Sequence, residues 1–138
     1  VTMGEVFTVL PFQNTLSTFR VSGATLLEAL ENGVGQITDG AGRFPQVAGM
    51  SFTVNPVAPV GERIADVMIG DTPLEPDRMY TVVSNNFLRN GGDGYAMFED
   101  AEDAYDFGPD IADVVAEYLA QQTPYTPYTD GRIKMAPR

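Results

Sequence analysis

The apolar residues of this chain follow two different spacings, and this restricts the folds that it can adopt. In residues 109–122, PDIADVVAEYLAQQ, apolar side chains recur at the three- and four-residue intervals of one helix face. In residues 15–22, TLSTFRVS, inward and outward positions alternate instead, which is typical of a strand. A chain with both patterns needs helices and a sheet, and we expect the helix at 109–122 to lie on that sheet.

The other segments extend the same mixed pattern. Thr2 and Glu5 have the spacing of a capping box at the start of a short helical turn. Ser22 suits the N-cap of a helix over 24–32, and Gly33 suits its end. Further strands are predicted at 49–55, 62–70, 80–87 and 131–136. The prediction is a single α+β domain over residues 1–138, with a mixed β-sheet packed with about three helices.

The composition of the chain argues against several classes of function. The net charge is −11, which argues against binding to nucleic acid, because that binding needs clustered Lys and Arg. The chain has no His and no Cys, so Ser–His and Cys–His nucleophile systems are impossible. No apolar stretch approaches the roughly 20 residues of a membrane span. Chemistry based on carboxylates or hard cations remains open.

The segment NNFLRNGGDGYAMF, at 85–98, is the most distinctive loop. Its glycines permit positive φ angles and a close approach of the backbone to a ligand. Asp93 stands between them with a carboxylate that can accept two hydrogen bonds. Two interpretations stay open at this point. The loop is either a turn at a strand end, stabilised by Asp93, or a ligand-binding loop.

Two known loop types share part of this segment but do not fit it. The Gly-Gly-Asp-Glu-Phe hairpin of diguanylate cyclases has a metal-binding Glu where this chain has Gly94. A calcium-binding β-roll repeat needs Asp where this chain has Ala96, and the chain has no internal repeat. The acidic stretch EDAEDAYDFGPD lacks the alternating ligand spacing of a calcium loop and is interpreted as a solvated surface.

Five segments in register resemble the C-terminal domain of the 5′-nucleotidase family, which includes UDP-sugar hydrolases. They are VFTVLPFQNTL, RVSGATLLEALE, GRFPQVAGMSFTV, NNFLRNGGDGYAMF and DGRIK. The resemblance implies the fold of that substrate-binding domain. It also implies that the chain lacks the first segment of the domain and an upstream metallophosphatase domain.

The resemblance also implies a set of ligand-binding residues. Phe12 and Phe87 would sandwich a nucleobase, and Asp93 would bind the ribose hydroxyls, with Gly92 and Gly94 letting the backbone approach the sugar. Stacking tolerates any base and contributes about 1–3 kcal/mol per base. The alternatives are that both rings belong to the core and that Asp93 stabilises its own turn. Arg89 departs from the family pattern and is expected to modify specificity, and a pocket blocked by Arg89 would favour a structural module with an unused pocket.

The resemblance places the chemistry outside this chain. A divalent metal pair is expected in the N-terminal metallophosphatase domain, and the chain itself is predicted to have no cofactor, no metal site and no catalytic activity. Its expected partners are a nucleotide or nucleoside and that N-terminal domain, within a secreted, periplasmic or cell-surface hydrolase of nucleotide catabolism. The alternative is a structural or interaction module with a vestigial pocket.

Overall fold

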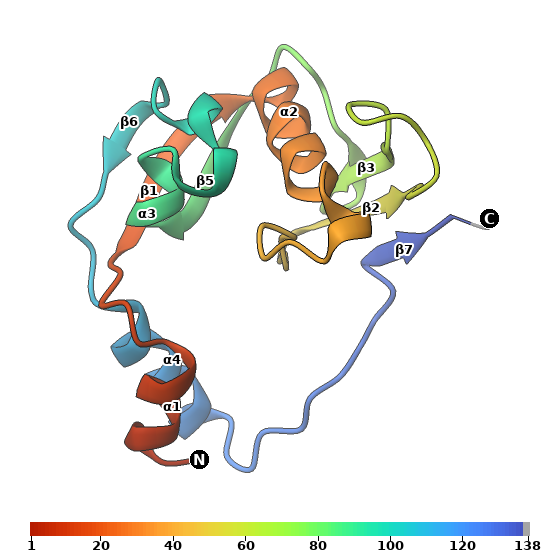
Figure 1. Cartoon of the computed structure of the whole chain (residues 1–138). Coiled ribbons are helices and arrows are strands. Elements are labelled where there is room, and N and C mark those ends of the chain that lie inside the picture. Colours follow the sequence, from red (N-terminus) through yellow and green to blue (C-terminus); the bar gives the residue numbers. More distant parts are fainter. Residues whose placement is uncertain (137–138) are drawn as a thin grey trace.

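The computed structural model describes residues 1–136, and in that range the chain forms two β-sheets and four α-helices (Figure 1). The helices are α1 (Met3–Val9), α2 (Gly23–Val34), α3 (Asn86–Arg89) and α4 (Ile111–Gln121). The strands are β1 (Leu16–Ser22), β2 (Met50–Val54), β3 (Ile64–Ile69), β4 (Thr72–Pro73), β5 (Met79–Asn85), β6 (Glu102–Tyr105) and β7 (Ile133–Met135). Short 3₁₀ turns occupy Ile37–Asp39, Gly92–Gly94 and Ala96–Phe98. The predicted α+β class is confirmed, but the strands divide between two sheets.

The first sheet is antiparallel and has the strand order β5-β1-β6. Its central strand buries Ser17, Phe19 and Val21, which are the residues expected on one face from the alternation in the sequence. The predicted strand at 15–22 is therefore confirmed, and the structure shows which of its two faces is buried. Strand β6 was not predicted, because its residues are all exposed and carry no alternating pattern.

The second sheet is mixed and has the order β4-β3-β2-β7. Strands β2 and β3 are antiparallel neighbours, whereas β7 runs parallel to β2, with Phe52 beside Ile133. Strand β7 comes from the far end of the chain and follows a long connection from α4 (Figure 1). This pairing confirms the expected last strand near the C-terminal end of the chain.

Helix α2 lies between the two sheets and supplies residues to both cores. Leu26 and Ala29 pack in one cluster with Phe19 of β1. Leu30 and Val34 pack in a second cluster with Phe52 of β2. These four residues are spaced as i, i+3, i+4 and i+8 and so form one apolar stripe, whose first two residues join one core and whose last two join the other.

The two ends of α2 are held by polar side chains. At the start, the Ser22 side chain accepts a hydrogen bond from the backbone N–H of Thr25, as predicted for an N-cap. At the other end the helix passes Gly33 and continues to Val34, so the predicted stop is wrong. A Cβ at Gly33 would lie 2.6 Å from Pro45, so this glycine serves close packing. The Arg63 guanidinium donates to the carbonyls of Val34 and Gly35 and so caps the helix.

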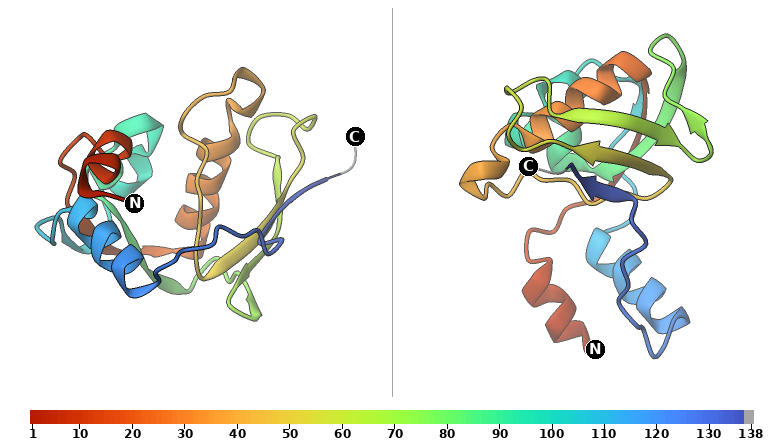
Figure 2. Two further views of the ribbon diagram at one scale, coloured as in Figure 1. Left: turned by 90° about the horizontal axis from the view of Figure 1, so that it is seen from below. Right: turned by 90° about the vertical axis from the view of Figure 1, so that its right-hand side faces the viewer.

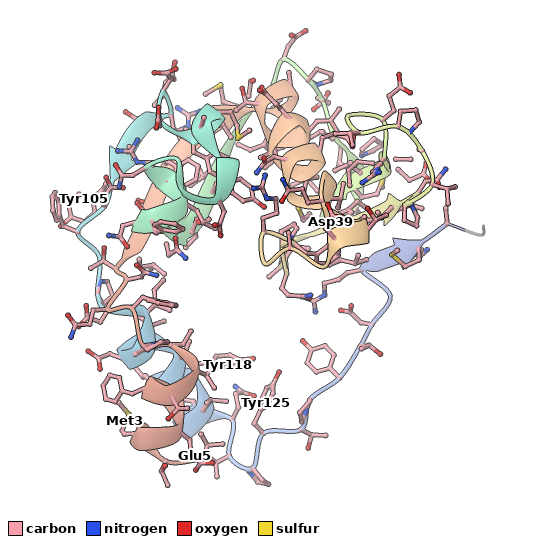
Figure 3. All side chains as sticks on the ribbon, viewed as in Figure 1. Met3, Glu5, Asp39, Tyr105, Tyr118 and Tyr125 are labelled. Atoms are coloured by element: carbon pink, nitrogen blue, oxygen red, sulfur yellow. The ribbon has the colours of Figure 1, made fainter. Side chains whose placement is uncertain are left out.

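Helix α4 does not lie on a sheet, contrary to the prediction. It packs against α1, and both helices stand away from the two sheets (Figures 1 and 2). Only Ala112 of this helix is fully buried. The Tyr118 side chain is half exposed and meets Tyr125 of the following segment, with the ring centroids 6.2 Å apart (Figure 3). An apolar stripe indicates that a helix face is covered, but it does not identify the covering element.

Helix α1 begins with the capping box that the sequence predicts. The Thr2 side chain accepts from the backbone N–H of Glu5, and the Glu5 carboxylate accepts from the backbone N–H of Thr2 at 2.9 Å. Within residues 1–136, no helix has both the length and the apolar character needed to cross a bilayer.

Candidate functional site

A cleft of about 1,320 Å³ opens between α2, β5 and the loop at 42–50. Phe12 and Asn14 contribute to its lining from the segment after α1, and Phe87 and Asp93 contribute from the segment after β5. The sequence separates these two groups by about seventy residues, and the fold brings them to one cavity. A cavity of this size is ample for a nucleoside or nucleotide.

Both predicted aromatic residues are exposed in the cleft. The Phe12 side chain is 80% exposed and the Phe87 side chain is 50% exposed, so neither is part of the hydrophobic core. This excludes the alternative in which both rings serve only packing. Apolar rings left open to solvent inside a concave site are candidates for contact with a ligand.

Helix α3 sets the position of Phe87. The Asn85 side chain accepts from the backbone N–H of Leu88 at 2.8 Å and caps the helix. The Asn86 side chain accepts from the backbone N–H of Thr15 at 3.0 Å, which ties the helix to the segment that carries Phe12. The asparagines of this loop therefore shape the backbone, which places Phe87 at the cleft.

The glycine loop is built around contacts that only glycine permits. A Cβ on Gly92 would lie 2.5 Å from the Phe87 ring, so the backbone here runs directly against that ring. Asp93 has a φ of 54° and Gly94 a φ of 80°, both in the left-handed region. Asp93 is exposed, and its hydrogen bond to Asn32 uses the main-chain carbonyl rather than the carboxylate. The carboxylate is therefore not used in the contact that holds the loop to Asn32.

The sequence analysis did not predict two residues of the site, one of which lines the cleft while the other holds the glycine loop. Asn32, at the end of α2, donates through Nδ2 to the Asp93 carbonyl at 3.1 Å. Arg43 lines the cleft, and its Nη1 donates to Asn32 Oδ1 at 3.1 Å. No local pattern marks either residue, because Asn32 and Asp93 lie 61 positions apart.

Tyr95 is a packing residue that connects the glycine loop to the core. It is 4% exposed, and its hydroxyl donates to the Arg43 carbonyl at 2.7 Å. Burial raises the pKa of the Tyr95 hydroxyl to about 12, which keeps the proton needed for this hydrogen bond in place. The loop that carries Arg43 is therefore fixed to the glycine loop.

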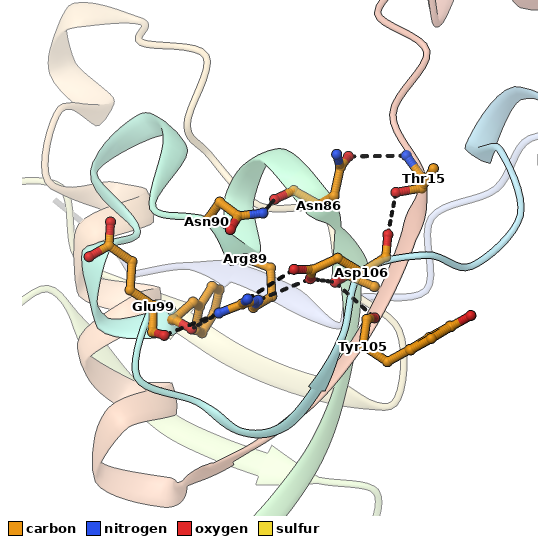
Figure 4. A network of polar contacts seen from close by, with 9 residues as sticks. Thr15, Asn86, Arg89, Asn90, Glu99, Tyr105 and Asp106 are labelled. Atoms are coloured by element: carbon orange, nitrogen blue, oxygen red, sulfur yellow. Dashed lines mark hydrogen bonds and ion pairs between the residues drawn. The ribbon is translucent and has the colours of Figure 1, made fainter.

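Arg89 neither lines nor blocks the cleft. Its Nε and Nη2 atoms bind the two carboxylate oxygens of Asp106 at 3.0 and 2.9 Å (Figure 4). Its Nη1 donates to the Glu99 carbonyl at 3.1 Å. The hydrogen bonds from Arg89 and from the Ser17 hydroxyl lower the pKa of Asp106 to about 2. Arg89 therefore does not obstruct the pocket, because these hydrogen bonds hold its guanidinium against Asp106.

The described residues contain no cluster of side chains of the kind that usually holds a metal ion. Among residues 1–136, no three His, Cys, Asp or Glu side chains gather closely enough to hold one. The metal pair implied by the family resemblance was expected in an N-terminal domain, not among these residues.

Comparison with known proteins decides the family. The family model for "5′-nucleotidase, C-terminal domain" matches residues 1–100. The chain belongs to this family. It is 38% identical over 97% of its length to the trifunctional nucleotide phosphoesterase protein YfkN of Bacillus subtilis, of which it covers 10%. It is 31% identical over 99% of its length to the 5′-nucleotidase of Homo sapiens, of which it covers 25%.

A solved structure agrees with this family assignment. The structure of the 5′-nucleotidase precursor from Thermus thermophilus matches 98% of the chain with a TM-score of 0.94 and 37% identity. The chain covers 28% of that protein. It thus spans a tenth to just over a quarter of the length of these relatives, over the 5′-nucleotidase C-terminal domain.

Proposed function

We propose that this domain recognises the nucleoside part of a nucleotide for a 5′-nucleotidase-type hydrolase. In this proposal, the rings of Phe12 and Phe87 stack on the two faces of the base, and the Asp93 carboxylate accepts hydrogen bonds from both ribose hydroxyls. The observation that carries it is that these three exposed residues line one cleft, although Phe12 is distant in sequence from the other two.

The chemistry of the sites supports this assignment. Stacking on aromatic faces is insensitive to the identity of the base, so broad tolerance of nucleosides is expected. An ionised carboxylate has acceptors only, which suits a diol that donates two hydrogen bonds. Gly92 and Gly94 keep the space beside Phe87 and Asn32 free of side chains, so that the loop backbone can lie close to the sugar.

The proposal assigns the reaction to another part of the protein. Hydrolysis would take place on a metal-bearing N-terminal domain, and the whole enzyme would be secreted, periplasmic or located at the cell surface. The names of the relatives support the kind of reaction, since two are called 5′-nucleotidases and one a nucleotide phosphoesterase, and the chain covers only 10%, 25% and 28% of them. The competing proposal, a structural or interaction module with an unused pocket, predicts no nucleoside binding.

The test is calorimetric titration of adenosine into the 138-residue chain and into its Phe87→Ala variant. We expect the substitution to weaken binding by about 1–3 kcal/mol, because it removes one stacking surface. Phe107→Ala is the matched control, since Phe107 is 81% exposed and lies outside the cleft lining. Equal affinities of the wild type and the Phe87→Ala variant would remove Phe87 from the site. Absence of any binding would favour the structural module.

A further inference from the structure

The backbone of Asp93 has a conformation that must be held by contacts from elsewhere in the fold. Its φ is 54°, in the left-handed region that residues with a side chain adopt only rarely. Asp93 is also exposed, so packing in the core does not fix it. The side chain starts from this backbone, and any contact that holds the backbone therefore also sets the position of the carboxylate.

The Asn32 side chain, near the end of α2, holds this backbone from outside the loop. Its Nδ2 donates to the Asp93 carbonyl at 3.1 Å, and its Oδ1 accepts from Arg43 Nη1 at 3.1 Å. A Cβ on Gly94 would lie 2.6 Å from Asn32 Oδ1 and 2.9 Å from Arg43 Nη1. Both side chains thus lie directly against the residue that follows Asp93.

The chemistry of the two partners fixes the orientation of the Asn32 amide. A guanidinium has only donors and a main-chain carbonyl has only acceptors. Oδ1 must therefore face Arg43, and Nδ2 must face the Asp93 carbonyl. Asparagine offers one acceptor and one donor group at the end of a short side chain, whereas an aspartate here could accept from Arg43 but could not donate to the carbonyl.

The backbone of Arg43 is held by the same loop. The Tyr95 hydroxyl donates to the Arg43 carbonyl at 2.7 Å, and Tyr95 is buried two positions after Asp93. Together with the two hydrogen bonds of Asn32, this contact closes a circuit that begins and ends in the glycine loop. A closed circuit with one member in the core restrains the loop before a ligand arrives, which lowers the entropy that binding has to overcome.

We propose that Asn32, oriented by Arg43, is a positioning residue that sets the Asp93 carboxylate to accept from both hydroxyls of the ribose. This inference rests on the proposed function, in which Asp93 is the ribose ligand. Among the described residues, Asn32 is not part of the cleft lining, so it acts through Asp93 rather than on the ligand. Asn32 then contributes to the selection of nucleosides with an intact 2′,3′-diol, and not to the stacking of the base.

The test compares calorimetric affinities for adenosine and for 2′,3′-dideoxyadenosine, which has the same base but lacks both ribose hydroxyls. We expect the wild type to bind adenosine at least about tenfold more tightly, because hydrogen bonds to a charged acceptor are lost with the diol. Asn32→Ala should reduce this ratio to about twofold and leave the affinity for dideoxyadenosine unchanged. Alanine forms helices better than asparagine, so a weakened α2 would not explain the loss.

Variants of Arg43 test whether it acts through Asn32. Arg43→Met should lower the adenosine preference, because the Asn32 amide is then no longer held in one orientation. Arg43→Lys should keep most of it, since an ammonium group also donates and cannot accept. In the Asn32→Ala background, Arg43→Met should cause no further loss of the preference. A further loss would show that Arg43 acts on the ligand directly and would overturn its assigned role.

Asn55→Ala is the matched control. The Asn55 side chain accepts from the backbone N–H of Val57 at 3.2 Å and lies outside the cleft, so the adenosine preference should survive its loss. An unchanged preference in Asn32→Ala, or an equal loss of affinity for both ligands, would overturn the role of Asn32 and leave the proposed function intact. A wild type that binds neither ligand, or binds both equally, would overturn the ribose site of the proposed function together with this inference.

Discussion

At the scale of single residues, the candidate site depends on one close contact between a backbone and a ring. The main chain at Gly92 runs so close to the Phe87 ring that an added Cβ would lie 2.5 Å from it. Phe87 is half exposed on the rest of its surface and remains open to the cleft. A small change at Gly92 therefore acts directly on the orientation of the proposed stacking ring.

We predict that Gly92→Ala weakens adenosine binding, because the new Cβ would lie 2.5 Å from the Phe87 ring and displace it. The loss should approach that of one stacking contact, about 1–3 kcal/mol, and is measured by calorimetric titration. Gly42→Ala is the control, since Gly42 also lines the cleft and has no atom within 4 Å of an added Cβ. Equal binding by the Gly92 variant and the control would contradict the role given to the ring.

At the scale of elements, an ion pair joins the site helix to the first sheet. Arg89 of α3 binds Asp106, which directly follows β6, and Ser17 of β1 donates to the same carboxylate. The Arg89 and Asp106 side chains are 15% and 20% exposed, so water screens the pair only partly. The network therefore joins α3, which carries Phe87, to β1 and to the residue that follows β6.

We predict that Asp106→Asn lowers the free energy of unfolding by about 2 kcal/mol at neutral pH. The reason is that folding lowers the pKa of this carboxyl, so the ionised group stabilises the folded state. The folded-state pKa of Asp106 is about 2 against an ordinary value of 3.8, so its contribution is present above pH 4. That contribution disappears as the pH falls from 3.8 towards 2. Urea unfolding of the wild type and the variant at several pH values measures the difference.

Asp103→Asn is the control for this pH dependence. Asp103 pairs with Arg20 at 3.7 Å, but its side chain is 74% exposed, so we expect a loss of less than about 1 kcal/mol. A difference between Asp106→Asn and the wild type that stays constant down to pH 2 would rule out the ion pair as its source.

At the scale of the whole molecule, two cores share one helix. The cluster of Phe19 and the cluster of Phe52 receive residues from adjacent turns of α2. Met50 packs against both clusters, so the two cores are in contact as well as connected by the chain. Disruption of either core removes support from α2 and hence from the other.

We predict one cooperative unfolding transition, which Leu26→Ala and Leu30→Ala both shift as a whole. Each substitution should cost about 2–5 kcal/mol, because each leaves a cavity in one of the two cores. Far-UV circular dichroism and near-UV tyrosine signals, followed in the same urea titration, should give coincident curves. Two separated transitions in the Leu30→Ala variant would show that the sheets unfold independently.

Several features followed from local sequence alone. The capping box at Thr2, the N-cap at Ser22 and the buried face of β1 each depend on side chains within a few positions of one another. The family motifs predicted the fold class, and they named Phe12, Phe87 and Asp93, which line a single cleft. Their roles as base and ribose ligands remain predictions.

Other features depend on contacts between distant parts of the chain. The α1 partner of α4, the division into two sheets and the positions of Arg43 and Arg89 have no local signature. The sequence determined the caps at Thr2 and Ser22 and most of the helices and strands, though not β6 or α3, because backbone preference and side-chain spacing act over a few residues. Only the tertiary structure decided which apolar faces meet and which charges pair, because those choices depend on surfaces that become neighbours only when the whole chain has folded.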